Sequence, residues 1–188
     1  AEDVHKVALN YVTGPPTAPL LSKLLTRALG IDVDGLVTLT NDPRFLTGIV
    51  PAASTVTTAW EMSRFFEIMR RGGELDGVRV IETETIREAL IERSHLEVDL
   101  SLGYPTRFSH GLMLGARMVS LFGLDTQHAF GHLGFINTLA WADPERGISV
   151  AVLNSGKPIV YPEFYMFLST MQRITTEMPK VPKSERML

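Results

Sequence analysis

Apolar residues recur every three or four positions between residues 17 and 30, the spacing of an amphipathic helix. Pro19 stands near the expected first turn, where its missing N–H costs little, and Gly30 follows the last apolar residue as a typical helix end. The chain up to Thr13 shows no regular period and is expected to be irregular. Residues 31–57 contain several turn-forming residues, so we expect connecting structure with one short helix.

The strongest helix signal follows this connection. Thr58 and Glu61 have the spacing of a capping box, and two glycines at 72–73 supply the stop. A short strand is expected at 78–80, and another helix is expected to begin near Thr83. The apolar face of the first of these helices consists of Ala59, Met62, Phe65, Phe66 and Met69.

The second half of the chain changes to the pattern of a sheet. One or two strands are expected within 110–122, and two apolar runs within 128–156 flank the turn 143–147, whose Pro and Gly suit a tight turn. Both faces of each run are apolar, which predicts two central strands covered on both sides. A final helix is expected from Pro162, packed across this hairpin, and the Lys- and Pro-rich tail from Pro179 is expected to be frayed. The apolar stripe of that helix is Phe164, Phe167, Leu168, Met171 and Ile174.

The composition is that of an ordinary globular protein, since 45% of the 188 residues are hydrophobic and 21% are charged. The net charge is -3, and Lys and Arg are spread along the chain, so no nucleic-acid partner is expected. The chain has no cysteine, which excludes disulfides and cysteine-ligated metals. We expect no membrane span, because no apolar run is long enough, and the first ten residues do not have the pattern of a signal peptide. The sequence leaves the localisation open.

Two histidines have a spacing that can hold a metal. His128 and His132 are four residues apart, which places two ligands on one face of a helix. Gly131 and Gly134 make a helix unexpected at this place, and the Glu of the H-E-x-x-H motif is missing. We therefore expect no metal, and the sequence gives no sign of another cofactor.

No serine of the sequence lies in a nucleophile motif. G-x-S-x-G is absent, and no Ser is followed by Lys three positions later, the spacing that lets the amine reach the hydroxyl on one helix face. Ser155 and Lys157 are the right residue types at the wrong spacing. Asp143 and Glu145 are paired carboxylates on a tight turn, and we expect them to be solvated turn residues rather than a catalytic pair.

Two stretches carry a resemblance to a known family. Residues 51–90 resemble the "Pro-Ala, small residues, then a Phe-rich helix ending in Gly-Gly" stretch of β-lactamase-related esterases, and residues 129–156 resemble the third-motif strand and following hairpin of the same family. The family includes class C β-lactamases, D-amino-acid peptidases and penicillin-binding-protein-like carboxylesterases. The resemblance implies an α+β fold, the C-terminal part of the β-lactamase/transpeptidase-like fold, with an antiparallel sheet flanked by helices and the final helix packed on the sheet. Residues 1–188 would then be one partial domain, with a helical and loop part at 1–95, sheet strands and the C-terminal helix at 96–178, and a tail at 179–188.

The resemblance also implies a site. His132-Leu133-Gly134 aligns with the K-T-G motif, and His in place of Lys favours the esterase-like branch. The backbone N–H of Phe135 would be one oxyanion-hole donor, and Gly134 would allow close approach to the substrate. His132 would face the pocket to bind substrate or to transfer a proton; the alternative is a buried strand histidine with a structural partner. Asn137 and Thr138 would add polar contacts to the substrate.

The other two family motifs are missing, because S-x-x-K is absent and no Tyr is followed two residues later by Asn or Ser. We therefore expect the C-terminal portion of a serine hydrolase that forms an acyl-enzyme on an ester, amide or β-lactam, and that is inactive alone. The expected partners are that small-molecule substrate and either the missing N-terminal segment or a second copy in a homo-oligomer. The alternative is a non-catalytic binding or scaffold module with the same fold.

Overall fold

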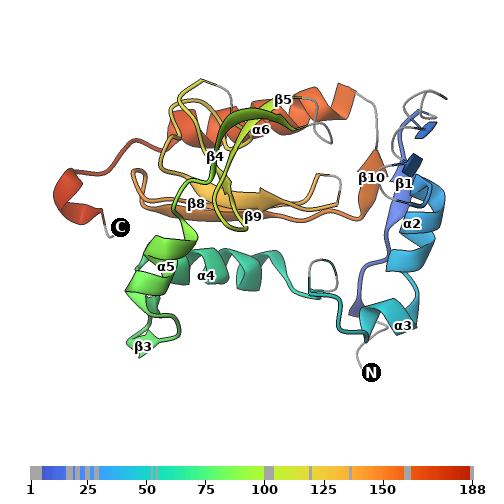
Figure 1. Cartoon of the computed structure of the whole chain (residues 1–188), viewed down its shortest axis with the longest axis horizontal. Coiled ribbons are helices and arrows are strands. Elements are labelled where there is room, and N and C mark those ends of the chain that lie inside the picture. The colour runs from blue at the N-terminus through green and yellow to red at the C-terminus, as the bar shows by residue number, and fades with distance from the viewer. Residues whose placement is uncertain are drawn as a thin grey trace.

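A six-stranded sheet between two long helices forms the centre of the molecule (Figure 1). The helix α4 (Ala59–Arg70) lies on one face of the sheet and α6 (Pro162–Glu177) on the other. The arrangement is the α+β class expected from the sequence. The computed structural model describes residues 6–15, 19, 22–23, 26–27, 30–51, 53, 55–99, 104–118, 120–135, 137–158 and 162–186.

The sheet is antiparallel throughout, and its strands follow one another in chain order. The strand expected within 110–122 is only two residues long, so most of that region is turn and loop. Two strands before it, which the apolar pattern did not reveal, extend the sheet. The strands are β4 (Ser94–Asp99), β5 (Tyr104–Phe108), β6 (Met113–Leu114), β7 (Phe130–Leu133), β8 (Leu139–Asp143) and β9 (Ile148–Val152).

The hairpin of β8 and β9 corrects one expectation. Every residue of β8 is buried, as predicted for a central strand, but β9 is half-buried and lies at the edge of the sheet. Both faces of β9 are nevertheless covered, because Val150 packs on the α6 side and Ala151 on the α4 side. Apolar residues on both faces of a strand indicate that both faces are covered. They do not indicate whether the strand has a neighbour on each edge.

The helices that cover the sheet begin and end where the sequence places them. Thr58 and Glu61 make both hydrogen bonds of the capping box at the start of α4, and the helix ends before Gly72 and Gly73, whose φ angles are 67° and 96°. Phe66 and Met69 of α4 contact the side of the sheet that carries Ala140 and Ala142. On the opposite side, Trp141 packs with Phe122 and with Phe167 and Met171 of α6, which confirms that the final helix crosses the hairpin.

The segment before α4 is more regular than expected. It contains two helices, α2 (Val33–Thr40) and α3 (Pro43–Leu46), and not one. Asp32 and Asp42 cap them, and each accepts a hydrogen bond from a backbone N–H of the first turn. The spacing of apolar residues does not reveal such caps. The chain up to Thr13 is also not irregular throughout. It contains β1 (Tyr11–Thr13), which pairs in parallel with β10 (Gly156–Pro158).

The helix expected at 17–30 falls largely outside the described residues. Residues 19, 22–23 and 26–27 are helical, and Gly30 has a φ of 75°, as a helix-ending glycine does. After α4, a small hairpin pairs β2 (Glu74–Leu75) with β3 (Val78–Arg79), so the expected strand includes Val78 but ends before Val80. The helix expected near Thr83 is α5 (Thr83–Ala89).

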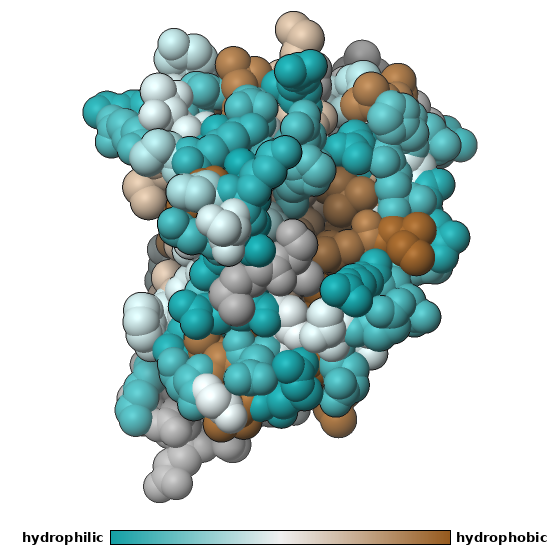
Figure 2. All heavy atoms as spheres, turned by 90° about the vertical axis from the view of Figure 1, so that its left-hand side faces the viewer, coloured by the Kyte–Doolittle hydropathy of each residue, from teal (hydrophilic) through white to brown (hydrophobic). Residues whose placement is uncertain are grey.

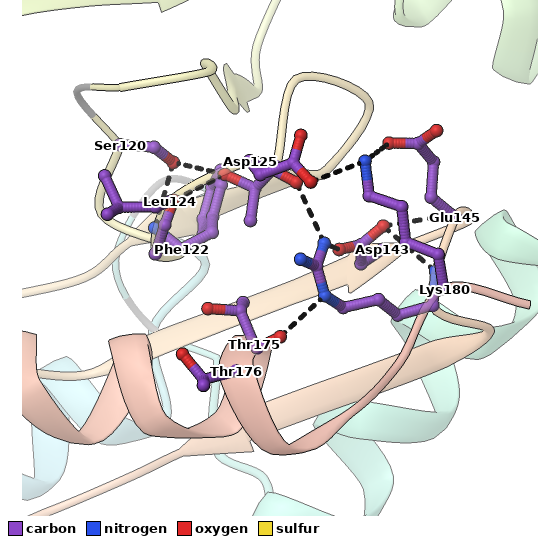
Figure 3. Close-up of polar contacts among 12 residues, drawn as sticks. Ser120, Phe122, Leu124, Asp125, Asp143, Glu145, Thr175, Thr176 and Lys180 are labelled. Atoms are coloured by element: carbon purple, nitrogen blue, oxygen red, sulfur yellow. Dashed lines mark hydrogen bonds and ion pairs between the residues drawn. The ribbon is translucent and has the colours of Figure 1, made fainter.

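The turn 143–147 and the C-terminal tail differ most from the expectation, because they form one buried network (Figure 3). Asp143 is fully buried and Glu145 is nearly so, although both were expected to be solvated. Arg146 pairs with Asp143 at 2.7 Å and donates to the carbonyl of Thr175 at the end of α6. Arg146 thus neutralises Asp143, which lets this carboxylate stay buried.

The tail is not frayed where it is described. The N–H of Val181 donates to the carbonyl of Glu145 at 2.8 Å, and Lys180 bridges Glu145 and Asp125 at 2.8 Å each. The guanidinium of Arg186, just beyond the 3-10 turn η2 (Lys183–Glu185), pairs with Glu145 at 2.7 Å. The tail therefore packs on the 143–147 turn through Lys180, Val181 and Arg186, while residues 182–185 remain exposed.

Candidate functional site

His132 lies near the end of β7, and its side chain is exposed. It is a strand residue, as the two nearby glycines predicted, but it is not the buried strand histidine of the alternative interpretation. Its Nδ1 lies 2.6 Å from the carbonyl oxygen of Leu133. A carbonyl oxygen only accepts, so this bond requires the hydrogen to be on Nδ1. In the neutral ring the Nε2 lone pair is then left to accept a hydrogen bond or a proton from a substrate.

The strand β7 is followed by residues 134–138, which connect it to β8, and the structure describes 134–135 and 137–138 of this loop. The N–H of Gly134 donates to the carbonyl of Thr138 at 2.7 Å and closes this loop. A Cβ on Gly134 would collide with the Thr138 hydroxyl, so a larger residue at this position would force the Thr138 side chain to move. Asn137 is buried and has a φ of 59°, in the left-handed region that Asn tolerates better than most residues.

Phe135 is half-buried at the bend of this loop. Among the residues that the structure describes, none accepts a hydrogen bond from its backbone N–H. The structure therefore places four of the five predicted site residues in the loop that follows β7, and the fifth, His132, at the end of β7 before it.

Two further polar residues lie against this loop, and the sequence did not single them out as site residues. The side-chain amide of Asn154 donates to the carbonyl of Asn137 at 2.6 Å, and the ammonium of Lys157 donates to the carbonyl of Asn154 at 2.9 Å. The Lys157 ammonium also lies 5.9 Å from the centre of the Phe135 ring. Polar residues that follow directly on an apolar strand, as these follow β9, are a sequence signal for a site. From the sequence alone, Lys157 was considered only as a partner of Ser155 in a catalytic Ser–Lys pair.

Lys157 is an unusual lysine because only 3% of its surface is exposed. Burial lowers its pKa below the ordinary value of a lysine, since a charged amine loses hydration there. The carbonyl of Asn154 and, at 3.4 Å, its Oδ1 compensate part of this loss. Burying an ammonium costs hydration free energy, so the hydrogen bonds that Lys157 makes must be kept, and they restrain the residues that accept them.

The opposite end of the sheet carries a different feature. A cavity of about 400 Å³ is lined there by the start of β7 and by the 143–147 turn. Figure 2 looks onto this end of the molecule, where apolar atoms show within a recess bordered by hydrophilic residues. His128 lines the cavity, whereas His132 is at the far end of β7, so the strand separates the two histidines. The described residues contain no group of three or more His, Asp or Glu side chains suited to a metal ion. None of the described helices combines the length and apolar character of a bilayer crossing.

Comparison with known proteins identifies relatives of this chain. The family model described as Beta-lactamase matches residues 6–162. The protein named "Esterase/beta-lactamase LipL" from Mycobacterium tuberculosis (strain ATCC 25618 / H37Rv) is 29% identical over 109 residues, which are 56% of this chain and 23% of that protein. A crystal structure of a penicillin-binding protein homologue from Caulobacter crescentus is 28% identical with a TM-score of 0.55, over 64% of this chain and 32% of that one.

Two further solved structures show the same fold over nearly the whole chain. One is a family VIII carboxylesterase, with a TM-score of 0.69 and 21% identity over 92% of this chain. The other is EstA from Arthrobacter nitroguajacolicus Rue61a, with a TM-score of 0.65 and 20% identity over 94% of this chain. The fold is therefore the β-lactamase/transpeptidase-like fold, as the resemblance implied. This chain spans 45% and 48% of those two structures, so it corresponds to less than half of each.

Proposed function

Since this chain belongs to the β-lactamase family, we propose that it is the C-terminal portion of a serine hydrolase that acts through an acyl-enzyme on an ester, amide or β-lactam. The observation that carries the proposal is the loop 134–138. It presents a backbone N–H at Phe135 that no described residue engages, three residues after the exposed His132. The relatives named as an esterase/β-lactamase and a carboxylesterase support this class of reaction.

The chemistry assigned to the loop is stabilisation of negative charge. When a serine hydroxyl attacks a carbonyl carbon, the carbonyl oxygen becomes an oxyanion, and a fixed N–H dipole lowers the energy of that state. The Phe135 N–H is one donor, and the N–H of the nucleophilic serine, which this chain does not contain in an S-x-x-K motif, is the other. Gly134, held against Thr138, lets the backbone approach the substrate closely.

His132 has two possible roles in this reaction. With a hydrogen on Nδ1 toward Leu133, its Nε2 can take a proton from the attacking hydroxyl and pass it to the leaving group, or accept a hydrogen bond from the substrate. Replacing His132 by Gln keeps a hydrogen-bonding group but removes the titratable nitrogen. A loss of kcat in His132→Gln equal to that in His132→Ala supports proton transfer, whereas a change in KM alone supports binding.

The second chain segment that the reaction needs has a place to pack. The outer edge of β9 has no partner strand among the described residues, and large apolar side chains such as Ile49 and Trp60 are exposed at 95% and 69%. Burying this surface favours association. We propose that the segment with the serine covers it, and that a second copy of the chain takes its place when that segment is absent.

A non-catalytic binding or scaffold module is the second candidate. It is favoured by the absence of an S-x-x-K motif from these 188 residues. The two candidates differ in one observation on the full-length product of the gene. A fluorophosphonate probe labels an activated serine in the hydrolase and labels nothing in the module.

The test of the proposed site uses a matched pair of variants in the full-length protein. Phe135→Pro removes the backbone N–H, whereas Phe135→Ala removes only the ring. We expect Phe135→Pro to lower kcat for a p-nitrophenyl ester by about 100- to 1000-fold, the effect of losing one oxyanion donor. Phe135→Ala is expected to keep most of the activity. Equal activities in two folded variants would show that this N–H is not an oxyanion donor.

A further inference from the structure

Asn154 and Lys157 make a continuous chain of hydrogen bonds to the candidate oxyanion loop. The Asn154 amide donates to the Asn137 carbonyl at 2.6 Å from the end of β9, on the far side of the hairpin. The Lys157 ammonium, on β10, donates to the Asn154 carbonyl at 2.9 Å. Residues 17 and 20 positions away in the sequence thus hold a loop that is only five residues long.

Among the described residues of the loop, one backbone hydrogen bond joins two of its members, from Gly134 to Thr138, so contacts from outside the loop add to its support. The left-handed conformation of Asn137 costs free energy for a residue with a Cβ, and it persists only when its surroundings fix it. The hydrogen bond from Gly134 to Thr138 joins the two ends of the loop. The hydrogen bond from Asn154 reaches the loop from outside, at the carbonyl of Asn137. Without Asn154, the buried carbonyl of Asn137 would lose this donor.

Lys157 adds a contact at the other end of the same loop. Its ammonium lies 5.9 Å from the centre of the Phe135 ring, in the range of a cation–π contact. One buried cation therefore touches Phe135 through the ring and, through Asn154, the backbone of Asn137. Phe135 carries the N–H that would bind the oxyanion, and Asn137 follows it by two positions.

We propose that Asn154 and Lys157 form a clasp that fixes the loop 134–138, so that both act as positioning residues for the oxyanion donor at Phe135. The proposal rests on the proposed function of the loop and adds two residues that touch neither the nucleophile nor the substrate. Since a displacement of about 1 Å can cost roughly 100-fold in rate, a clasp of this kind determines whether the donor is effective.

The test measures Asn154→Ala, Lys157→Met and the double variant in the full-length protein. We expect kcat for a p-nitrophenyl ester to fall by about 10- to 100-fold in each single variant, with KM changed less than about twofold. The affinity for phenylboronic acid, whose tetrahedral serine adduct places an oxygen in the oxyanion site, is expected to fall in parallel. The double variant is expected to be no slower than the worse single variant, because the two residues act as one unit. Lys183→Met, at an exposed lysine, is the matched control.

Two further variants separate positioning from a general loss of structure. Lys157→Arg keeps a charged donor and is expected to recover part of the kcat that Lys157→Met loses. Asn154→Asp keeps the size and the acceptor for Lys157 but loses the donor to Asn137, so it replaces Asn154→Ala if that variant does not fold. Folding is checked by a cooperative thermal transition.

The outcomes distinguish the clasp from the function on which it rests. Folded variants that retain kcat and boronic-acid affinity within twofold of an active wild type overturn the clasp alone. Multiplicative losses in the double variant also overturn it, because they indicate independent residues. A wild-type full-length protein that neither hydrolyses the ester nor is labelled by a fluorophosphonate overturns the proposed function, and the clasp with it.

Discussion

The two ends of the central sheet are held in different ways. At the turn 143–147, buried Asp143, Glu145 and Arg146 make ion pairs, and partly exposed cations of the C-terminal tail pair with Glu145. At the loop 134–138, the Asn154 amide donates to the Asn137 carbonyl, the Lys157 ammonium donates to the Asn154 carbonyl, and His132 remains exposed. The helix α4 spans the distance between these ends, with its capped start near the loop and its basic end near the turn (Figure 1).

The 143–147 turn is built for stability, whereas the 134–138 loop leaves groups free for function. A network of buried pairs is intolerant of the loss of any member, because the partner is left charged without compensation. A loop closed by a few bonds to carbonyls keeps an N–H and an imidazole available to a ligand. The comparison predicts that variants at the turn reduce stability, whereas variants at the loop reduce activity in a protein that still folds.

The largest effect is expected from Asp143→Ala at the charged end. This change removes the fully buried carboxylate and leaves Arg146 buried without its partner, so the free energy of unfolding is expected to fall by about 3–5 kcal/mol. Urea denaturation of the full-length protein measures this. Arg173→Ala is the control, since its pair with Glu177 is exposed and is worth about 0–1 kcal/mol. Equal losses in the two variants would contradict the distinction between the two kinds of pair.

The next effect is expected at the site end. His132→Ala is expected to lower kcat/KM for an ester by about 100-fold, the scale of general acid–base catalysis by one side chain. The free energy of unfolding is expected to change by less than about 0.5 kcal/mol, because the side chain is exposed. His95→Ala, another exposed histidine, is the control for both measurements. A large loss of unfolding free energy in His132→Ala would show that this residue contributes to stability, as the residues of the 143–147 turn do.

A smaller effect is expected from Thr58→Ala at the start of α4. The substitution removes the side-chain acceptor of the capping box and is expected to cost about 1 kcal/mol of unfolding free energy. Thermal or urea denaturation measures it, and Thr57→Ala, one residue earlier, is the control. Full activity at a temperature below the transition would show that the cap acts on stability alone.

The smallest effect is a pH dependence at the other end of α4. Burial opposes the ionisation of Glu67, but Arg70 and Arg71 outweigh it and lower its pKa to about 2. A carboxyl with a lowered pKa stabilises the folded state above its ordinary pKa of 4.5, and this contribution is lost as the pH falls toward 2. We expect a loss of about 1 kcal/mol between pH 6 and pH 3, measured by urea denaturation. Glu67→Gln is expected to remove this part of the slope, and an unchanged slope would assign it to other carboxyls.

Local sequence signals predicted the helices that carry their own end signals. The capping box at Thr58, the glycines at 72–73 and the apolar stripe of α6 act within a few residues, so their consequences can be read without knowing what packs nearby. The strands β4 and β5 were missed because their residues alternate poorly and are partly exposed. The aspartates that cap α2 and α3 were missed because their helices are short.

The candidate site divides in the same way. The order of residues 132–138 in the sequence was sufficient to group His132, Gly134 and Phe135, since neighbours in a chain stay neighbours in a loop. Asn154 and Lys157 could not be assigned to that group, because only the β8–β9 hairpin brings them to the loop. Asp143 and Glu145 were assigned to solvent because their cationic partners lie on the same turn and on the distant tail.

The sequence by itself determined the helices α4, α5 and α6, the β8–β9 hairpin, the family, and the stretch that carries the candidate oxyanion donor. These features depend on residues that are near one another in the chain, so residue types and their spacing are sufficient to predict them. Only the tertiary structure decided that β9 is an edge strand, that the tail packs on the 143–147 turn, and that a buried lysine supports the loop. Those features depend on which distant groups meet, and the cost of burying a charge is met only by the partner that the fold brings to it.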